Sequence, residues 1–297
     1  MPIETVVSRY SNNEPQLDLF DHMQKYFGQH WISYPIAEEG LNRFRRILAY
    51  PETNRPPCCL VYGKANAGKS LLCERFMLET NPKDTGQAEA SVKPVIMVQT
   101  PESPRLSALY SNIIDSLGAP ISPTMSTDKK RDQVVNLLRR LQTKIIIIDE
   151  IHHILDGSMD KQGQFLNAIK TLTNQLRISI IAVGTEEAHR AIHLDPQFGS
   201  RFDPFYLPQW EMGDKYAEFI ANLCLSLGFE GIDSVITSQK FIRRLHTMSD
   251  GLTGETREIV CRLVELAGTT GRNQLSFDML AEIRWTSPGD RLRVAHV

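Results

Sequence analysis

The sequence contains few cysteines, and their arrangement is not that of a metal site or a disulfide framework. Five cysteines occur among 297 residues: Cys58 and Cys59 are adjacent, and Cys73, Cys224 and Cys261 stand far apart. There is no CxxC pair and no His/Cys ligand cluster. Structural zinc sites and disulfide-rich secreted domains depend on such patterns, so we expect neither class.

Long apolar segments are also absent. No apolar run is long enough to span a bilayer. The first residues, MPIETVVSRYSNNEPQ, lack the apolar core of a signal peptide. We therefore expect a cytoplasmic protein with no membrane partner. The formal net charge of -2 neither favours nor excludes a nucleic-acid partner, because basic patches can exist at any net charge.

The sequence does contain short apolar runs that alternate with helical patterns. Four runs are rich in Val and Ile, and a shorter candidate strand follows them: CCLVYG, PVIMVQT, KIIIIDE, ISIIAVGT and then FDPFYLP. Near-continuous Val/Ile runs are typical of parallel strands buried on both faces. From about Gly213 onward the pattern is helical. We predict an α/β fold, with a parallel sheet flanked by helices and then a small helical domain.

The expected organisation has four parts. They are an N-terminal extension over residues 1–30, an α/β core over 31–212, a helical lid over 213–285 and a tail over 286–297. Helical spacing also predicts amphipathic helices in LDLFDHMQKYFGQHW and in AEEGLNRFRRILAY, which precede the first strand. No internal repeat and no low-complexity tract interrupts this organisation.

A glycine-rich loop follows the first apolar run and fits the pattern GxxxxGKS. Its residues are Gly63, Lys64, Ala65, Asn66, Ala67, Gly68, Lys69 and Ser70. Such glycines let backbone N–H groups point at phosphate oxygens, and the positive end of the next helix faces the same place. Lys69 would reach the β- and γ-phosphates of ATP, and the Ser70 hydroxyl would bind Mg²⁺. The alternative is a chance glycine turn, which the preceding strand and the following helix disfavour.

The run KIIIIDE supplies a pair of carboxylates. Asp149 stands at the carboxyl end of a buried strand, where open α/β sheets bind ligands and an aspartate holds Mg²⁺. Glu150 is then placed to polarise an attacking water. The alternative is a surface Asp-Glu pair. His152 and His153 follow, but adjacent side chains on a helix do not point at one site, so we expect a structural or coupling role for them rather than a metal site.

Three more polar residues are candidates for nucleotide sensing. Thr185 ends its strand and either contacts the γ-phosphate, caps the next helix, or does both. Arg201 precedes the last strand and would point towards a neighbouring subunit, where an arginine can stabilise charge on the transferred phosphoryl group. Its alternative is a surface arginine that pairs with Asp203 or Asp195. Arg257 begins a helix of the lid, where it either folds over the phosphates or stays solvated.

Together these motifs resemble an AAA+ ATPase, with a phosphate loop, IIIIDE, a strand-end threonine, SRF, and GLTGETR in a helical lid. More narrowly, several long stretches resemble the TniB-type transposition ATPases, which are close to the TnsC regulators. They include HWISYPIAEEGLNRFRRILAYPETNRPPCCLVYGKANAGKS, VQTPESPRLSALYSNIIDSLGAP and KIIIIDEIHHILDGS, and then FLNAIKTLTNQLRISIIAVGTEEAHRAIHLDPQFGSRFDPFYLPQW. The resemblance covers about Trp31 to Ile283.

The resemblance implies roles by position. Gly63 to Ser70 become the nucleotide loop, and Asp149 and Glu150 become the metal and water pair. Thr185 becomes the first sensor, Arg201 the arginine finger and Arg257 the second sensor. Two departures are visible: AAA+ proteins often have Asn at the first-sensor position, and the lid motif reads GETR. Trp31 and Tyr34, in WISYP, are candidates to lie beside the adenine, or else they pack in a core.

The resemblance also implies a surface that binds DNA, between the second strand and the Asp-Glu strand. That segment offers Arg105, Thr127, Lys129, Lys130 and Arg131. Lysine and arginine can bind phosphates without reading sequence. The alternative is a solvated helix start, and Asp128 and Asp132 dilute the positive charge.

The leading hypothesis is an ATPase that binds ATP and Mg²⁺ and assembles with itself on double-stranded DNA as a ring or filament. The resemblance implies that it recruits a transposase with a DDE active site and works with a target-selection protein. No DDE triad is evident here, so another protein would perform strand transfer. One alternative is an ATP-gated scaffold that recruits proteins with little turnover. Another is a different AAA+ role, such as helicase loading.

Overall fold

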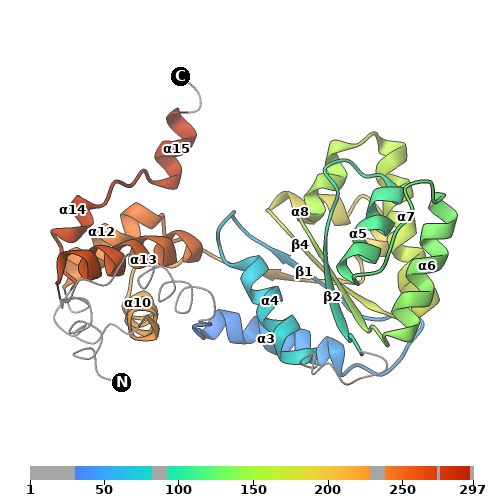
Figure 1. Ribbon diagram of the computed structural model, residues 1–297, viewed down its shortest axis with the longest axis horizontal. Coiled ribbons are helices and arrows are strands. Elements are labelled where there is room, and N and C mark those ends of the chain that lie inside the picture. The colour runs from blue at the N-terminus through green and yellow to red at the C-terminus, as the bar shows by residue number, and fades with distance from the viewer. Residues whose placement is uncertain (1–30, 82–91, 228–237, 273–274, 295–297) are drawn as a thin grey trace. The chain divides into compact units, whose positions relative to one another are not determined.

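The computed structural model describes residues 31–81, 92–227, 238–272 and 275–294 (Figure 1). The chain divides into two compact units. One is Pro35–Pro208, and the other combines Met1–Tyr34 with Gln209–Val297. The helix expected in LDLFDHMQKYFGQHW lies, apart from Trp31, outside the described residues.

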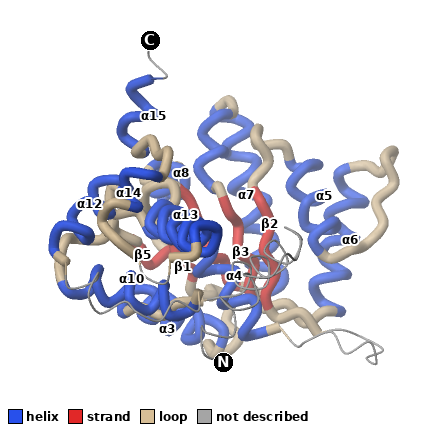
Figure 2. The backbone as a smooth tube through the Cα atoms, turned by 60° about the vertical axis from the view of Figure 1, so that its left-hand side comes forward, coloured by secondary structure: helices blue, strands red, loops and turns tan. Residues whose placement is uncertain are grey.

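The Pro35–Pro208 unit is built on one parallel sheet of five strands in the order β2-β3-β4-β1-β5. Figure 2 shows these strands side by side in red. The strands are β1 (Cys58–Tyr62), β2 (Val95–Gln99), β3 (Ile145–Asp149), β4 (Ser179–Gly184) and β5 (Phe202–Tyr206). The predicted α/β fold class is therefore confirmed, and each of the five apolar runs forms a strand.

Burial on both faces explains why the strands are apolar throughout. All five residues of β3 and all six of β4 are buried. β-Branched residues favour strands that pack in this way. Register then brings strand tips together: Tyr62 lies opposite Gly184, and Gln99 lies opposite Asp149. Since β4 separates β1 from β3, the loops after these three strands meet at one edge of the sheet.

Helices cover both faces of the sheet (Figure 1). One face packs against α5 (Leu106–Ser116), α6 (Thr127–Arg140), α7 (Met159–Leu176) and α8 (Glu187–Ile192), in a core that includes Leu109, Val134 and Phe165. On α3 (Pro35–Leu48) and α4 (Lys69–Thr80), Phe44 and Phe76 pack edge to face with ring centroids 5.3 Å apart. Two short elements complete the unit, the 3-10 helix η1 (Ile151–Asp156) and α9 (Pro196–Gly199).

The other unit is helical. Among its described residues, the elements are α10 (Asp214–Ser226), α12 (Gln239–Ser249), α13 (Thr253–Thr270), α14 (Met279–Glu282) and α15 (Pro288–Val294). The buried Tyr216 anchors its core, because its hydroxyl lies 3.1 Å from the Ser249 hydroxyl and 2.9 Å from that of Thr256. The Trp210 ring stacks on Phe219 with centroids 4.7 Å apart. This unit therefore has its own apolar core, closed by a satisfied polar network.

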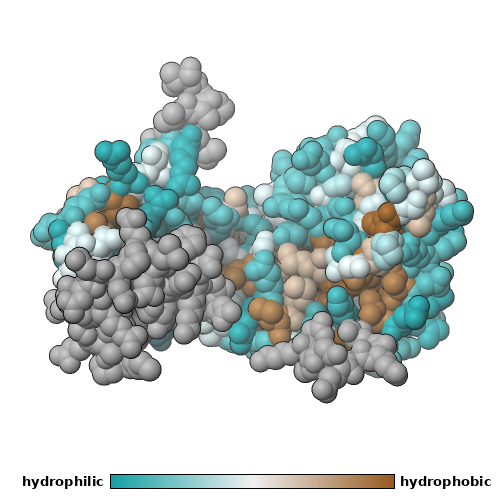
Figure 3. All heavy atoms as spheres, in the orientation of Figure 1, coloured by the Kyte–Doolittle hydropathy of each residue, from teal (hydrophilic) through white to brown (hydrophobic). Residues whose placement is uncertain are grey.

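The coloured residues on the face shown in Figure 3 are mostly hydrophilic, with separate hydrophobic patches among them. Exposed large apolar side chains such as Leu78 and Met159 are scattered. Single exposures of this kind are normal for folded proteins. Within the described ranges, no helix combines the length and the apolar character that crossing a membrane requires.

Candidate nucleotide site

The loop between β1 and α4 depends on glycine at both of its ends. At Gly63, where φ is 156°, a Cβ would lie only 2.4 Å from the Leu207 carbonyl oxygen. Gly68 is the N-cap of α4 and has a left-handed φ of 97°, which favours glycine. Asn66, with φ 60°, is also left-handed. The loop therefore turns tightly into the first turn of α4, where the backbone N–H groups have no partner within the helix.

Lys69 and Ser70 are the first two residues of α4. The Lys69 ammonium donates hydrogen bonds to the carbonyl oxygens of Gly63 (3.0 Å) and Lys64 (2.7 Å), so it lies across the loop. Burial lowers the pKa of Lys69, while the carboxylates of Glu150 and Asp149 act in the opposite direction. Among the described residues, the hydrogen-bond acceptors of this buried cation are neutral carbonyl oxygens, and such a cation suits an anionic partner.

Asp149 ends β3 directly opposite this helix start. The Ser70 hydroxyl donates to Asp149 Oδ2 over 2.7 Å, and the other carboxylate oxygen accepts from the Glu150 N–H over 2.8 Å. Thr100, at the tip of β2, donates through its hydroxyl (2.8 Å) and its N–H (2.9 Å) to the Asp149 carbonyl oxygen. The carboxylate is buried and fixed from both sides. Sequence reasoning did not assign Thr100, although its place after an apolar strand was a visible signal.

Glu150 has a left-handed backbone, with φ 53° and ψ 39°. This conformation is uncommon for a residue other than glycine and is enriched at functional sites. It turns the chain abruptly from β3 into η1. The half-buried carboxylate therefore follows Asp149 at the same edge of the sheet.

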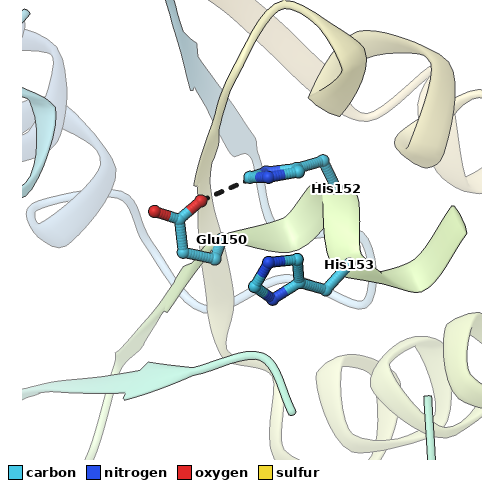
Figure 4. Close-up of side chains that lie close together, drawn as sticks. All are labelled: Glu150, His152 and His153. Atoms are coloured by element: carbon cyan, nitrogen blue, oxygen red, sulfur yellow. Dashed lines mark ion pairs between the residues drawn. The ribbon is translucent and has the colours of Figure 1, made fainter. Parts of the chain in front are cut away.

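Glu150 faces two histidines (Figure 4). Its Oε2 lies 3.2 Å from His152 Nδ1, and the rings of His152 and His153 have centroids 4.8 Å apart. One ligand atom from each of the three side chains lies within 4.8 Å of the others. The expectation that adjacent histidines would point at different sites is therefore wrong, because in η1 the two rings lean together. His152 also touches the tip of β4, since a Cβ on Gly184 would lie 3.1 Å from its Nδ1.

Thr185 follows directly after β4. Its Oγ1 is buried and has no hydrogen-bond partner among the described residues. The N-cap of α8 is Glu186, and no side chain caps that helix. The hydroxyl therefore does not cap α8. An orphaned buried hydroxyl at this edge suits a polar ligand, because such atoms are otherwise satisfied.

Arg201 lies at the opposite end of the strands. Its carbonyl oxygen accepts from the N–H of Cys58, the first residue of β1, whereas the phosphate loop follows the last residue of β1. Its guanidinium donates to Asn174 Oδ1 over 2.9 Å. The two carboxylates considered as its partners are occupied elsewhere. Asp203 pairs with Arg43 at 2.8 Å, and Asp195 pairs with Lys170 at 2.6 Å, a hydrogen bond that lowers the pKa of Asp195.

Three other candidates belong to the helical unit. Arg257 is the fifth residue of α13. Tyr34 packs against Trp210 (4.8 Å between centroids) and Phe219 (5.6 Å), and burial raises its pKa. This packing favours a core role for Tyr34 over contact with adenine. Trp31 is half-buried in the same unit.

The candidate DNA-binding residues divide into two kinds. Lys130 is buried on α6, and its ammonium donates to the hydroxyls of Ser107 and Ser111, both at 2.9 Å. By contrast, Arg105, Lys129 and Arg131 are exposed. We call these three exposed residues the basic surface. Arg131 lies near Asp128 (3.8 Å) and Asp132 (3.3 Å), and Thr127 begins α6 after its N-cap Ser126.

The residues at the carboxyl edge fit a nucleoside triphosphate with Mg²⁺. The loop requires glycine where a backbone turns closely, Lys69 is a buried cation, and Thr185 offers an unpartnered hydroxyl. Ser70 and Asp149 offer oxygen ligands 2.7 Å apart, the atom type that Mg²⁺ prefers.

The structure is similar to several solved structures. It matches the ORC1 protein of Aeropyrum pernix in complex with DNA at TM-score 0.61 and 18% identity, over 88% of this chain and 66% of that chain. It matches the ORC2 protein of the same organism, in ADPNP–ADP complexes, at 0.60 and 16%, over 87% and 71%. It matches domain III of the replication initiation protein DnaA of Thermotoga maritima at 0.52 and 13%, over 88% and 94%. No curated protein matches the sequence.

The sheet, its helices and these neighbours define the fold of an AAA+ P-loop ATPase. Within that class, the family model described as bacterial TniB protein matches residues 23–212. The chain belongs to the TniB family, which confirms the resemblance found in the sequence.

Proposed function

We propose that this protein is an ATP-dependent AAA+ regulator of transposition. It binds ATP and Mg²⁺, assembles with itself on double-stranded DNA without reading sequence, and recruits and activates a DDE transposase. A target-selection protein is the other expected partner. Membership of the TniB family and the similarity to an ORC1 protein solved with DNA support this proposal.

The observation that carries the proposal is the convergence of five side chains at one edge of the sheet. They come from the start of α4, the tip of β3 and the residue after each of β3 and β4: Lys69, Ser70, Asp149, Glu150 and Thr185. The Ser70–Asp149 contact shows directly that two of these segments meet. A chance glycine turn has no reason to meet a buried carboxylate and an orphaned hydroxyl at the same place.

Each side chain has a distinct task in this proposal. Lys69 neutralises charge on the β- and γ-phosphates, and Ser70 and Asp149 hold Mg²⁺. The bound metal supplies charge neutralisation at the phosphate oxygens. Glu150 accepts a proton from the attacking water or orients that water, and Thr185 positions it or contacts the γ-phosphate. Arg257, on α13, is our candidate for the second sensor.

Arg201 is assigned to a neighbouring copy's nucleotide. It lies at the amino end of β5, whereas its own phosphate loop lies at the carboxyl end of β1. An arginine supplied in trans completes a phosphoryl-transfer site only when two copies meet. Hydrolysis should therefore depend on assembly.

The test is electron microscopy of the protein with ATP, with and without duplex DNA, together with steady-state ATPase measurements on the same samples. We expect rings or filaments that need ATP, and hydrolysis that rises when DNA is added. Assembly and hydrolysis that ignore DNA would contradict the DNA-binding part of the proposal.

A second candidate function is an ATP-gated scaffold with little turnover, and the contact between Glu150 and His152 favours it. The Glu150 Oε2 lies 3.2 Å from His152 Nδ1, so an imidazole occupies one side of the carboxylate where a water would have to approach. In that case ATP would drive assembly while hydrolysis stayed slow with DNA present. The ATPase measurement separates the two candidates, because only the first predicts DNA stimulation.

A further inference from the structure

A second cluster of polar groups lies away from the nucleotide site, where the chain enters β1 and β5. Five residues line a pocket of about 440 Å³ there: Asn54, Arg55, Asn174, Gln197 and Arg201. They come from the segment before β1, from α7, and from α9 and the residue before β5. All five belong to the Pro35–Pro208 unit.

The pocket contains two positive charges and no carboxylate in its lining. Arg55 donates to the Ser200 hydroxyl at 3.1 Å, and Arg201 donates to the Asn174 side-chain oxygen at 2.9 Å. Neither arginine forms an ion pair within the described part of the chain. Guanidinium groups stay charged at any physiological pH, so the positive charge is permanent.

One donor on a residue that lines the pocket also lacks an acceptor. The Nε atom of Arg201 is buried and has no hydrogen-bond partner among the described residues. Buried donors are almost always satisfied, so this one points to a missing acceptor. Two planar guanidinium groups with a free donor match a phosphate group, whose oxygens accept pairs of N–H bonds.

The chain's own nucleotide cannot supply that phosphate. The Cys58 N–H bonds to the Arg201 carbonyl oxygen at the start of β1, and Arg55 lies three residues before Cys58. The phosphate loop begins after Tyr62, at the other end of the strand. Four residue steps along a strand separate the two ends by roughly 13 Å. A phosphate that fills this pocket must therefore come from another molecule.

We propose that Arg55 acts together with Arg201 as a two-arginine receptor for the γ-phosphate of ATP held by a second copy of the chain. This inference rests on the proposed function, in which Arg201 alone is the finger, and adds Arg55 as a second contact. The occupant that we propose is a nucleotide-loaded second copy, because its triphosphate is negatively charged and the pocket is positive. Free phosphate and DNA phosphate are the competing sources.

The experiment compares Arg55→Ala, Arg201→Ala and the control Arg46→Ala, an exposed arginine on α3. Assembly with a slowly hydrolysed ATP analogue is followed by analytical ultracentrifugation, and ATPase rates are measured in parallel. We expect Arg55→Ala to need about tenfold to hundredfold more protein to assemble, the range for a lost charged hydrogen bond. Binding of a fluorescent ATP analogue by the dilute chain should not change. Arg55→Lys should recover little, since lysine lacks the planar fork.

Mixing variants distinguishes a contact in trans from a structural role. Arg55→Ala mixed with Glu150→Gln should regain part of the ATPase activity, because some interfaces then combine an intact arginine pair with an intact glutamate. Arg55→Ala mixed with Arg201→Ala should regain none, because each receiving copy lacks one arginine. No recovery in the first mixture, or recovery in the second, would overturn the proposal.

The remaining outcomes distinguish failure of the Arg55 inference from failure of the proposed function and from other sources of phosphate. If Arg55→Ala behaves like Arg46→Ala while Arg201→Ala is defective, the proposed function stands and the Arg55 inference fails. If the wild type neither assembles nor hydrolyses ATP, the proposed function itself fails. Loss of duplex affinity at unchanged assembly would assign the pocket to DNA phosphate. Saturable binding of inorganic phosphate by the dilute wild type, lost in Arg55→Ala, would assign it to free phosphate.

Discussion

The nucleotide site and the basic surface hold their charged groups in opposite ways. In the site, Lys69 and Asp149 are buried, and each bonds to protein atoms within 3.0 Å. On the basic surface, Arg105, Lys129 and Arg131 are exposed to water. A buried group acts at nearly fixed geometry and low dielectric, while an exposed group is screened and adds little by itself. A single substitution in the site should therefore abolish its function, whereas each substitution on the basic surface should lower DNA affinity by a small step.

The largest expected effect is that of Lys69→Ala. No other cation of the loop lies across the phosphate position as the Lys69 ammonium does. We expect ATP binding to be lost, as measured by titration with a fluorescent ATP analogue. The control is Lys64→Ala in the same loop, whose side chain is exposed. Equal affinities of the wild type and Lys69→Ala for the ATP analogue would contradict the assignment of this loop as the phosphate-binding loop.

Glu150→Gln should separate binding from chemistry. The substitution keeps the size of the side chain but loses the charge that we propose polarises water, so hydrolysis should slow by about 10²-fold or more. ATP binding should persist and the ATP-bound assembly should last longer. Single-turnover hydrolysis and the lifetime of the assembly measure the two parts. A wild-type rate would show that another group acts on the water.

A smaller effect is expected from the basic surface. The double variant Arg105→Ala/Lys129→Ala removes two exposed cations that a duplex can contact. Each lost phosphate contact should lower the log–log slope of affinity against salt by about 0.9. Affinity should fall about equally for all sequences, while assembly without DNA should stay unchanged. Fluorescence anisotropy of a labelled duplex across a salt series makes the measurement. An unchanged slope would place DNA on another surface.

Lys130→Ala tests the contrast between buried and exposed charges within the single helix α6. Its expected effect is the smallest of these predictions. Lys130 is buried between two serine hydroxyls, so it belongs to the packing of α5 against α6 rather than to the basic surface. Losing both hydrogen bonds should lower the free energy of unfolding by about 1–2 kcal/mol. Denaturant unfolding measures this change. The log–log slope of DNA affinity against salt should remain that of the wild type. A reduced slope would show that Lys130 belongs with the basic surface.

The predictability of these features follows from their physical origin. The strands could be predicted from the sequence because β3 and β4 are buried on both faces, and such burial requires apolar runs. The loop was readable because Gly63 leaves no room for a Cβ. These constraints act within a few residues of the chain.

Features formed by segments far apart in the sequence could not be predicted in this way. The burial of Lys130 depends on serines about twenty positions earlier, so its charge alone suggested an exposed contact. The approach of His152 to Glu150 depends on a tight 3-10 turn that helical periodicity does not reveal. The pocket around Arg55 joins segments more than a hundred residues apart.

The left-handed backbone of Glu150 has a consequence for thermal stability. A residue with a long side chain is strained at φ 53°, whereas asparagine and glycine adopt this conformation readily. Glu150→Asn should therefore raise the melting temperature slightly while it removes the carboxylate that we propose acts on water. A search for heat-resistant variants that scored folding alone would select this change. It would yield a more stable protein that still binds ATP but hydrolyses it slowly.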